Sequence, residues 1–254
     1  MASYICWNKR AGGMMLYCLI DHDNVASHLP RLSAVLSTWA GEIAHEFRLP
    51  TVGDITVRTY GGWWREELAS EARFSATQLY PEHCPALIRT TGHYWRVRFE
   101  FADSLLLPRG VRCNVPDIKH TVIGRPAPPL SISKALGGTC GEPNCEITRC
   151  RRWIFQRRGC TRNACPQMFS QVWVRTEQKQ VDTHLAVDLM QLCCFWHENV
   201  HVALISDDVD FLPALVASSV TTRSAESLTH VRMEGRATYL DNFLTKCGLR
   251  IVNL

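Results

Sequence analysis

Three groups of acidic residues have the composition of a binding site for a divalent cation. They are Asp21 with Asn24 in "LIDHDN", Asp182 with Asp188 in "VDTHLAVDL", and Asp207, Asp208 and Asp210 in "LISDDVDF". Gathered carboxylates repel one another unless a cation neutralises them, and a set of oxygen ligands favours Mg²⁺ or Mn²⁺. Such a cation activates water and stabilises negative charge on a phosphate group. The chemistry indicated by these residues is therefore hydrolysis of a phosphate ester.

Two apolar runs and one helical pattern must position these acids. Residues 14–20 ("MMLYCLI") and 200–206 ("VHVALIS") are typical of buried strands, and residues 181–197 have the pattern of a helix. Strands that alternate with helices predict a mostly parallel central sheet flanked by helices, in which ligands bind beyond the carboxyl ends of the strands. Asp182 begins the late helix, whereas Asp188 falls on another face, so Asp182 is the expected ligand.

Capping of helices is the alternative explanation for any single aspartate. Asp207 or Asp208 could cap a helix expected over residues 210–219, and Asp23 or Asn24 could cap one expected over residues 24–47. Because several acidic groups follow strand ends together, we favour the cation site for the set as a whole.

The three acidic segments, in this order, resemble the NYN domain, a branch of the PIN-like nuclease superfamily. The resemblance rests on "LIDHDN", "KQVDTHLAVDL" and "LISDDVDFLPAL", includes "RTYGGWW", and covers about residues 14–107 and 169–254. It implies a PIN-like three-layer α/β fold and cleavage of RNA, or less often DNA, by a metal-activated water. Some members of the family bind RNA and cleave it poorly, so a non-catalytic RNA-binding or scaffold protein is an alternative.

The resemblance also implies a role for individual residues. The expected ligands of Mg²⁺ or Mn²⁺ are Asp21, Asp182, Asp208 and Asp210, with Asn24 as the accompanying amide and Lys179, Asp188 and Ser206 in supporting positions. Asp207 stands where the family prefers glycine. We therefore expect the turn at Asp207 to differ from the family pattern and count this residue as supporting.

A phosphatase is the rival enzyme. "DHDNV" also fits the first motif of haloacid-dehalogenase-like phosphatases, in which Asp21 would be the nucleophile and Asp23 the general acid. The sequence has no clear apolar strand ending in the serine or threonine that would hold the phosphate. Lys179 belongs to a Lys-x-Val-Asp pattern that fits the nuclease better, so we favour the nuclease.

Five of the twelve cysteines lie between residues 140 and 165, which indicates a metal site because four thiolates hold a structural Zn²⁺. Cys-x4-Cys spacing occurs at both ends of the cluster, so the expected ligands are Cys140, Cys145, Cys160 and Cys165, with Cys150 as the alternative ligand. We expect residues 108–168 to be an irregular, Pro- and Gly-rich segment with a small zinc-binding insertion. The nuclease domain would then be discontinuous, over residues 1–107 and 169–254. The alternative is a loop that contains cysteines by chance.

Arginines within the same segment predict contact with nucleic acid. Arg149, Arg151, Arg152, Arg157 and Arg158 surround Trp153. Guanidinium groups bind phosphates and aromatic rings stack on bases, so RNA is the expected partner, although a solvated basic face would have the same composition.

The composition is that of an ordinary soluble globular protein, with 46% hydrophobic and 20% charged residues. No apolar run approaches the ~18 residues of a membrane span. The N-terminal apolar stretch ends in acidic residues, which predicts a strand instead of a signal peptide. We therefore expect a cytoplasmic protein without a membrane partner, and one for which homo-oligomer formation is compatible with the sequence.

Overall fold

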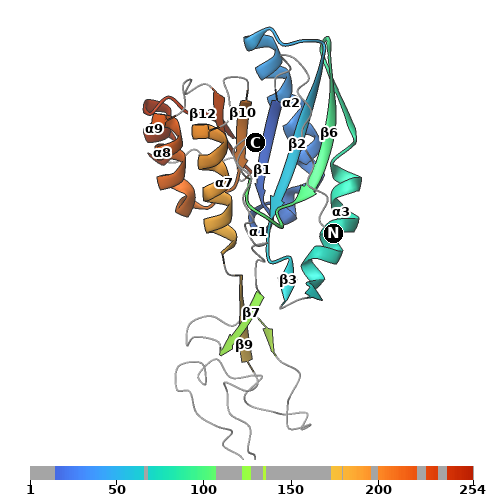
Figure 1. Ribbon diagram of the computed structural model, residues 1–254, viewed down its shortest axis with the longest axis vertical. Coiled ribbons are helices and arrows are strands. Elements are labelled where there is room, and N and C mark those ends of the chain that lie inside the picture. The colour runs from blue at the N-terminus through green and yellow to red at the C-terminus, as the bar shows by residue number, and fades with distance from the viewer. Residues whose placement is uncertain are drawn as a thin grey trace, which may run out of the picture.

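The computed structural model describes residues 15–65, 68–106, 122–126, 134–135, 173–178, 180–195, 200–221, 227–233 and 239–253 of the 254-residue chain. A seven-stranded sheet forms its centre, in the order β12-β11-β10-β1-β2-β6-β5 (Figure 1). Its strands are β1 (Met15–Asp21), β2 (Val52–Tyr60), β5 (Leu87–Thr90), β6 (His93–Phe101), β10 (Val200–Ile205), β11 (Leu228–Arg232) and β12 (Arg250–Asn253). All neighbouring strands are parallel except β5, which is antiparallel to β6. The expectation of an α/β fold with a mostly parallel sheet is thereby confirmed.

Helices cover the two faces of this sheet. The α-helices are α1 (His22–Val25), α2 (Leu29–Phe47), α3 (Glu71–His83), α7 (Val181–Phe195), α8 (Leu212–Thr221) and α9 (Tyr239–Lys246), and short 3-10 helices are η1 (Ala26–His28) and η2 (Val209–Phe211). From β1 the chain proceeds to β2 on one side, and β10 lies on the other side of β1. Crossovers are right-handed, so α2 and α8 cover opposite faces. The carboxyl ends of β1 and β10 therefore meet at a switch point, where ligands of such sheets bind.

Strand β1 divides the core into two layers because successive side chains point to opposite faces. Leu16, Cys18 and Ile20 are buried in the cluster that includes the apolar side of α2. Tyr17 and Leu19 are buried in the second cluster, which includes α7, α8 and α9. With every side chain of residues 16–20 at most 2% exposed, β1 is the central strand that fixes the position of Asp21 at its end.

The first long helix begins later than the sequence indicated. We expected it from residue 24, but α2 begins at Leu29 after α1 and η1, with Pro30 in its first turn. Proline fits the first turn of a helix, where its missing N–H would have had no partner in the helix. The short α1 instead follows β1 directly and places Asn24 one turn after Asp21.

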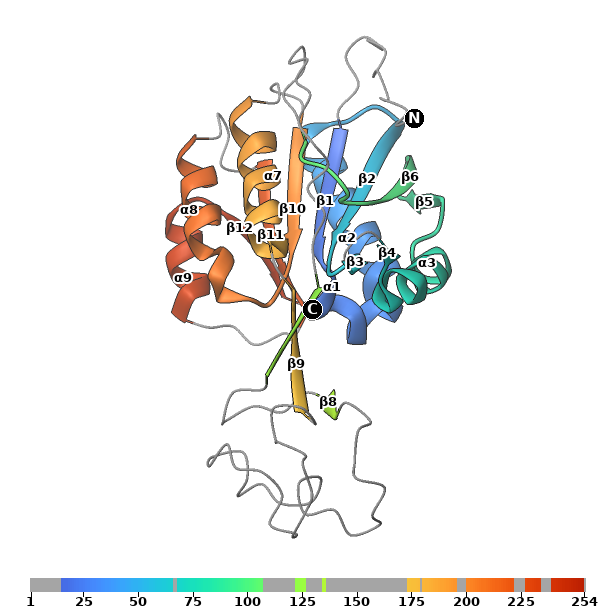
Figure 2. The same ribbon diagram turned by 60° about the horizontal axis from the view of Figure 1, so that its bottom comes forward.

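Several strands were not expected from the sequence. They include β5 and the two-residue strands β3 (Trp64–Arg65) and β4 (Leu68–Ala69), which are too short for a periodic pattern. The segment expected to be irregular contributes β7 (Val122–Pro126) and β8 (Lys134–Ala135), and both pair with β9 (Trp173–Gln178) in an antiparallel sheet. Figures 1 and 2 show β7 and β9 projecting from the edge at which β1 and β10 end.

None of the helices in the described part of the chain combines the length and the apolar character of a membrane span.

Candidate functional site

Asp21, Asn24 and Ser206 form a hydrogen-bonded group at the carboxyl ends of the two central strands. Ile20 of β1 is paired with Ile205 of β10, so the residues that follow them, Asp21 and Ser206, lie side by side. The Ser206 hydroxyl donates to Oδ2 of Asp21 at 3.1 Å. The Asn24 amide donates to the same oxygen, and its Nδ2 lies 3.4 Å from Oγ of Ser206. The carboxylate of Asp21 is thus fixed by two donors from two different elements.

The environment of Asp21 makes its negative charge costly. Its side chain is buried, and burial raises its pKa to about 6, against the opposing effect of the hydrogen bonds from Asn24 and Ser206. The carboxylates of Asp23 and Asp182 raise the pKa of Asp21 further. A nearby cation would remove this cost, since an opposite charge favours the ionised form of a carboxyl group.

Asp182 belongs to the same edge of the sheet, as the sequence predicted. It lies in the first turn of α7 and is exposed. Desolvation by the surrounding protein raises the pKa of its carboxyl group, and the carboxylates of Asp208, Asp210 and Asp23 raise it further. Repulsion among these groups shows that their negative charges are gathered on one side of the molecule.

Asp208 and Asp210 lie in the turn that follows β10. The backbone N–H of Asp208 donates to Oγ of Ser206 at 3.1 Å, so the turn is attached to the Asp21 group. Oδ1 of Asp208 accepts from the N–H of Asp210 at 2.9 Å and caps η2. Asp208 therefore has the capping role considered from the sequence, and this role uses one of its two carboxylate oxygens.

Asp207 is directed away from this group. Its Oδ1 accepts from the backbone N–H of Met233 at 3.1 Å and lies 3.6 Å from Nε of Arg232. Arg232 in turn lies 3.3 Å from Oδ1 of Asp241. Adjacent residues in extended backbone point to opposite sides, and Asp208 has the extended values φ −78° and ψ 128°. Asp207 therefore attaches the turn after β10 to the end of β11.

Asp188 also lies apart from the acidic edge, about 9 Å along α7 from Asp182. Its side chain is fully buried, 3.0 Å from Nε of Arg58, and accepts hydrogen bonds from the Tyr60 hydroxyl at 2.7 Å and the Leu106 N–H at 2.8 Å. Asp188 thus connects α7 with β2 and with the loop after β6.

Arg58 is the central residue that sequence reasoning missed. It is 5% exposed, lies 2.7 Å from Oε1 of Glu100, and also donates to the carbonyl oxygen of Ser104. Its position in β2, among threonine and apolar residues, gave only a weak sign that a charge would be buried there. Its partner Asp188 is 130 residues distant, and no local pattern connects the two.

The chemistry of the acidic edge fits a hard divalent cation. The available ligand atoms are carboxylate oxygens with the amide of Asn24 beside them. The carboxylate of Asp182 raises the pKa of Asp21, and the carboxylates of Asp208, Asp210 and Asp23 raise the pKa of Asp182. As the side chains lie, no three His, Cys, Asp or Glu residues within the described ranges are close enough together to hold a metal ion.

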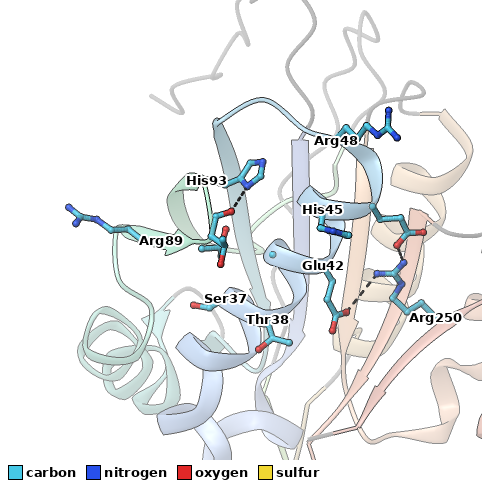
Figure 3. Close-up of a pocket in the computed structure, with 12 residues that line it drawn as sticks. Ser37, Thr38, Glu42, His45, Arg48, Arg89, His93 and Arg250 are labelled. Carbon is cyan, nitrogen blue, oxygen red and sulfur yellow. Dashed lines mark hydrogen bonds and ion pairs between the residues drawn. The ribbon is translucent and has the colours of Figure 1, made fainter.

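A separate open groove lies at the opposite edge of the sheet. It has a volume of about 1420 Å³ and is lined by α2, the turn between β5 and β6, and the beginning of β12. Figure 3 shows Arg250 directed toward Glu42, from which its Nη1 is 3.7 Å away, while Arg48 and Arg89 point outward. The groove therefore lies at the amino ends of the strands, away from the acidic residues.

The remaining residues expected at functional sites lie outside the described part of the chain. They are Lys179, the cysteines Cys140, Cys145, Cys150, Cys160 and Cys165, the arginines Arg149, Arg151, Arg152, Arg157 and Arg158, and Trp153.

Comparisons of the chain with protein-family models, with curated proteins and with solved structures found no match. We therefore infer function from the geometry and chemistry of the site itself, because one fold can carry many unrelated activities.

Proposed function

We propose that the protein is a metal-dependent ribonuclease of the PIN-like, NYN type. The observation that carries this proposal is the hydrogen-bonded group of Asp21, Asn24 and Ser206 at the carboxyl ends of β1 and β10. Asp182, Asp208 and Asp210 supply further negative charge beside it. Similar acids in the same chain order carry the resemblance to nucleases, and the central position of their strands supports it.

The chain's residues divide into ligands and positioning groups. Asp21, Asp182, Asp208 and Asp210 would hold Mg²⁺ or Mn²⁺, which activates water and stabilises charge on the phosphodiester. Asn24 and Ser206 hold the Asp21 carboxylate in one orientation. The Ser206 hydroxyl also accepts from the N–H of Asp208, so one side chain orients parts of two ligand groups.

Residues 108–168, which separate the two parts of the proposed nuclease domain, contain a second candidate metal site. The β7–β9 sheet projects from the acidic edge, and the sequence between β8 and β9 contains the clustered cysteines and arginines. We propose that four of these cysteines bind one structural Zn²⁺ and that the arginines bind RNA phosphates near the acidic edge. Metal analysis of the purified protein tests the zinc, with about one zinc per chain expected.

A panel of substrates tests the reaction class. Purified full-length protein is incubated with single-stranded RNA, single-stranded DNA and p-nitrophenyl phosphate, with Mn²⁺, with Mg²⁺ and without added metal. The proposal expects cleavage of RNA that depends on the added cation. Hydrolysis of the phosphomonoester alone would instead establish a phosphatase, and RNA binding without cleavage would establish a binding or scaffold protein.

A further inference from the structure

A buried histidine of β11 holds the end of β10 on the side away from β1. In the sheet β11 lies next to β10, and His230 is paired with Leu204. Nε2 of His230 lies 2.9 Å from the carbonyl oxygen of Ser206, and the N–H of Ser206 donates to the carbonyl oxygen of Val231 at 3.3 Å. Both backbone groups of Ser206 are therefore bonded to β11, while its hydroxyl is bonded to Asp21.

The contact between His230 and Ser206 requires the histidine to be the donor. A carbonyl oxygen only accepts hydrogen bonds, so Nε2 carries the hydrogen. Nδ1 is buried and has no hydrogen-bond partner among the residues that the structure describes. Burial lowers the pKa of His230 below 6.5, against the opposing effect of its bond to Ser206. The Arg232 guanidinium lowers this pKa further, and the carboxylates of Asp241 and Asp207 raise it. The ring is therefore neutral near pH 7, with its one donor bonded to Ser206.

The surroundings leave His230 little room to move. Its side chain is 6% exposed, and Ser206 is fully buried. Helices α8 and α9 lie on the side of β10, β11 and β12 (Figure 1). The cavity beside the ring has a volume of only about 20 Å³ and is lined by residues 207–209 of the turn and by leucines of α8 and α9. Close packing of this kind keeps the imidazole, and the carbonyl group that it holds, in one position.

The carbonyl group held by His230 belongs to the peptide group that joins Ser206 to Asp207. A peptide group is planar, so fixing its carbonyl oxygen also fixes the direction in which the chain leaves β10. The side chain of Asp207 is then held by the N–H of Met233 at 3.1 Å. The N–H of Asp208 donates back to the Ser206 hydroxyl at 3.1 Å. One peptide group thus precedes the point at which the two aspartates diverge.

We propose that His230 is a positioning residue for the acidic turn. Its Nε2–H orients the peptide group between Ser206 and Asp207, so that Asp207 points toward β11 and Asp208 toward the other acids of the edge. This inference rests on the proposed function, because Asp208 is a proposed ligand of the cation. His230 acts through Ser206 and not by contact with the cation or the substrate.

Three replacements of His230 separate its hydrogen bond from its size. His230→Gln can place an N–H donor at the position of Nε2, whereas the shorter side chain of His230→Asn reaches only the position of Nδ1. His230→Leu fills a similar volume without a donor. His201→Leu is the matched control, because His201 is also buried, at 3% exposed, but lies at the beginning of β10 in contact with Phe47.

Amide hydrogen exchange reports the position of the turn independently of any cation. It is measured by NMR on the full-length ¹⁵N-labelled protein at neutral pH without divalent cations. The N–H groups of Asp208 and Met233 report on the turn, since they bond to Ser206 and Asp207. The N–H of Val35 within α2 reports on the whole fold. Isothermal titration with MnCl₂ then measures the Kd for Mn²⁺.

Loss of the donor is expected to loosen the turn and leave the rest of the fold intact. In His230→Leu and His230→Asn the amides of Asp208 and Met233 exchange roughly two- to twelvefold faster, the factor for one hydrogen bond, and Val35 is unchanged. The Kd for Mn²⁺ rises by roughly tenfold in both variants, the lower end of the effect of groups that orient metal ligands. His230→Gln and His201→Leu stay close to wild type in both measurements.

Three results would overturn the inference. They are unchanged exchange of the turn amides in His230→Leu, equal exchange in His230→Gln and His230→Asn, and acceleration at Val35 by the same factor as in the turn. The last result would show that His230 only stabilises the fold. Should His230→Leu not fold, the comparison of His230→Gln with His230→Asn still decides.

Failure of this inference is distinguishable from failure of the proposed function. If the wild type binds no Mn²⁺, the proposed function fails, and amide exchange alone decides whether His230 positions the turn. If the wild type binds Mn²⁺ and cleaves RNA while the turn amides are unchanged in the His230 variants, only the positioning role fails.

Discussion

The hydroxyl of Ser206 donates a hydrogen bond to Oδ2 of Asp21 over 3.1 Å and joins the carboxyl ends of β10 and β1. The same hydroxyl accepts the N–H of Asp208 at 3.1 Å. One uncharged side chain thus sets the relative position of an acid on β1 and the acidic turn after β10.

Replacing Ser206 by alanine is expected to weaken cation binding without unfolding the protein. Groups that orient metal ligands are worth about 10- to 100-fold in affinity, so Ser206→Ala should raise the Kd for Mn²⁺ by about that factor. Isothermal titration with MnCl₂ measures it. Ser218→Ala is the matched control, because Ser218 is equally buried but contacts Met190 on α7. An unchanged Kd in Ser206→Ala would contradict the orienting role.

Separating Asp188 from Arg58 is expected to destabilise the fold strongly. Removing one partner of a buried ion pair leaves an uncompensated charge and costs about 3–5 kcal/mol, so Arg58→Met should lower the free energy of unfolding by that amount. Urea unfolding of Arg58→Met, Asp188→Leu and the double variant measures the coupling free energy between the two side chains. The double variant should lose less free energy of unfolding than the sum of the losses in the two single variants.

The pair of Arg96 and Asp54 is the control for this cycle. Its side chains are 56% and 44% exposed, so Arg96→Met should change the free energy of unfolding by at most about 1 kcal/mol. Equal losses of unfolding free energy in Arg58→Met and Arg96→Met would contradict the structural role assigned to Asp188.

The principal parts of the fold followed from the sequence because they depend on local patterns. The run that ends at Asp21 and the run that ends at Ser206 are apolar enough to predict central strands, and parallel strands place their ends at one edge. The pattern of residues 181–197 predicted a helix with Asp182 at its start, and α7 begins at Val181.

Other features depend on contacts between distant residues and could not be inferred locally. Asp207 and Asp208 look equivalent in the sequence, and only the position of Met233 and Arg232 on the neighbouring strand shows that Asp207 is directed away. The burial of Arg58 likewise depends on Asp188 and Glu100, which belong to other elements. The strand β7 was missed because its five residues pair with β9, far along the chain.

His201 is expected to reduce stability in mild acid. Burial lowers its pKa from 6.5 to about 4 in the folded protein, and its side chain is 3% exposed against Phe47. Above pH 6.5 the imidazole is neutral in both states. As the pH falls below 6.5 the unfolded chain takes up the proton first, so stability declines until about pH 4, by roughly 3 kcal/mol for this group.

Replacing His201 by leucine should remove this contribution. The free energy of unfolding, measured by urea between pH 4 and 7, should vary less with pH in His201→Leu than in wild type. His45→Leu is the control because His45 is exposed on α2. The same pH dependence in His201→Leu and wild type would contradict the assignment.

Asp207 is expected to contribute to stability. Asp207→Ala leaves the Met233 N–H without its acceptor and removes a partner of Arg232, which costs about 1–3 kcal/mol. Asp207→Asn retains an oxygen that can accept the hydrogen bond, so it should lose less stability than Asp207→Ala. Chemical unfolding of both variants measures the difference, and equal stability of wild type and Asp207→Ala would show that the contact is unimportant.

The adjacent residues Asp207 and Asp208 provide the most direct test of the proposed nuclease. The single measurement is the rate of Mn²⁺-dependent cleavage of a labelled single-stranded RNA by wild type, Asp207→Asn and Asp208→Asn. Both variants remove one negative charge from the same turn, but only Asp208 is proposed as a ligand. We predict that Asp207→Asn cleaves at nearly the wild-type rate and that Asp208→Asn is slower by at least about 100-fold. Equal rates for Asp208→Asn and wild type would contradict the account.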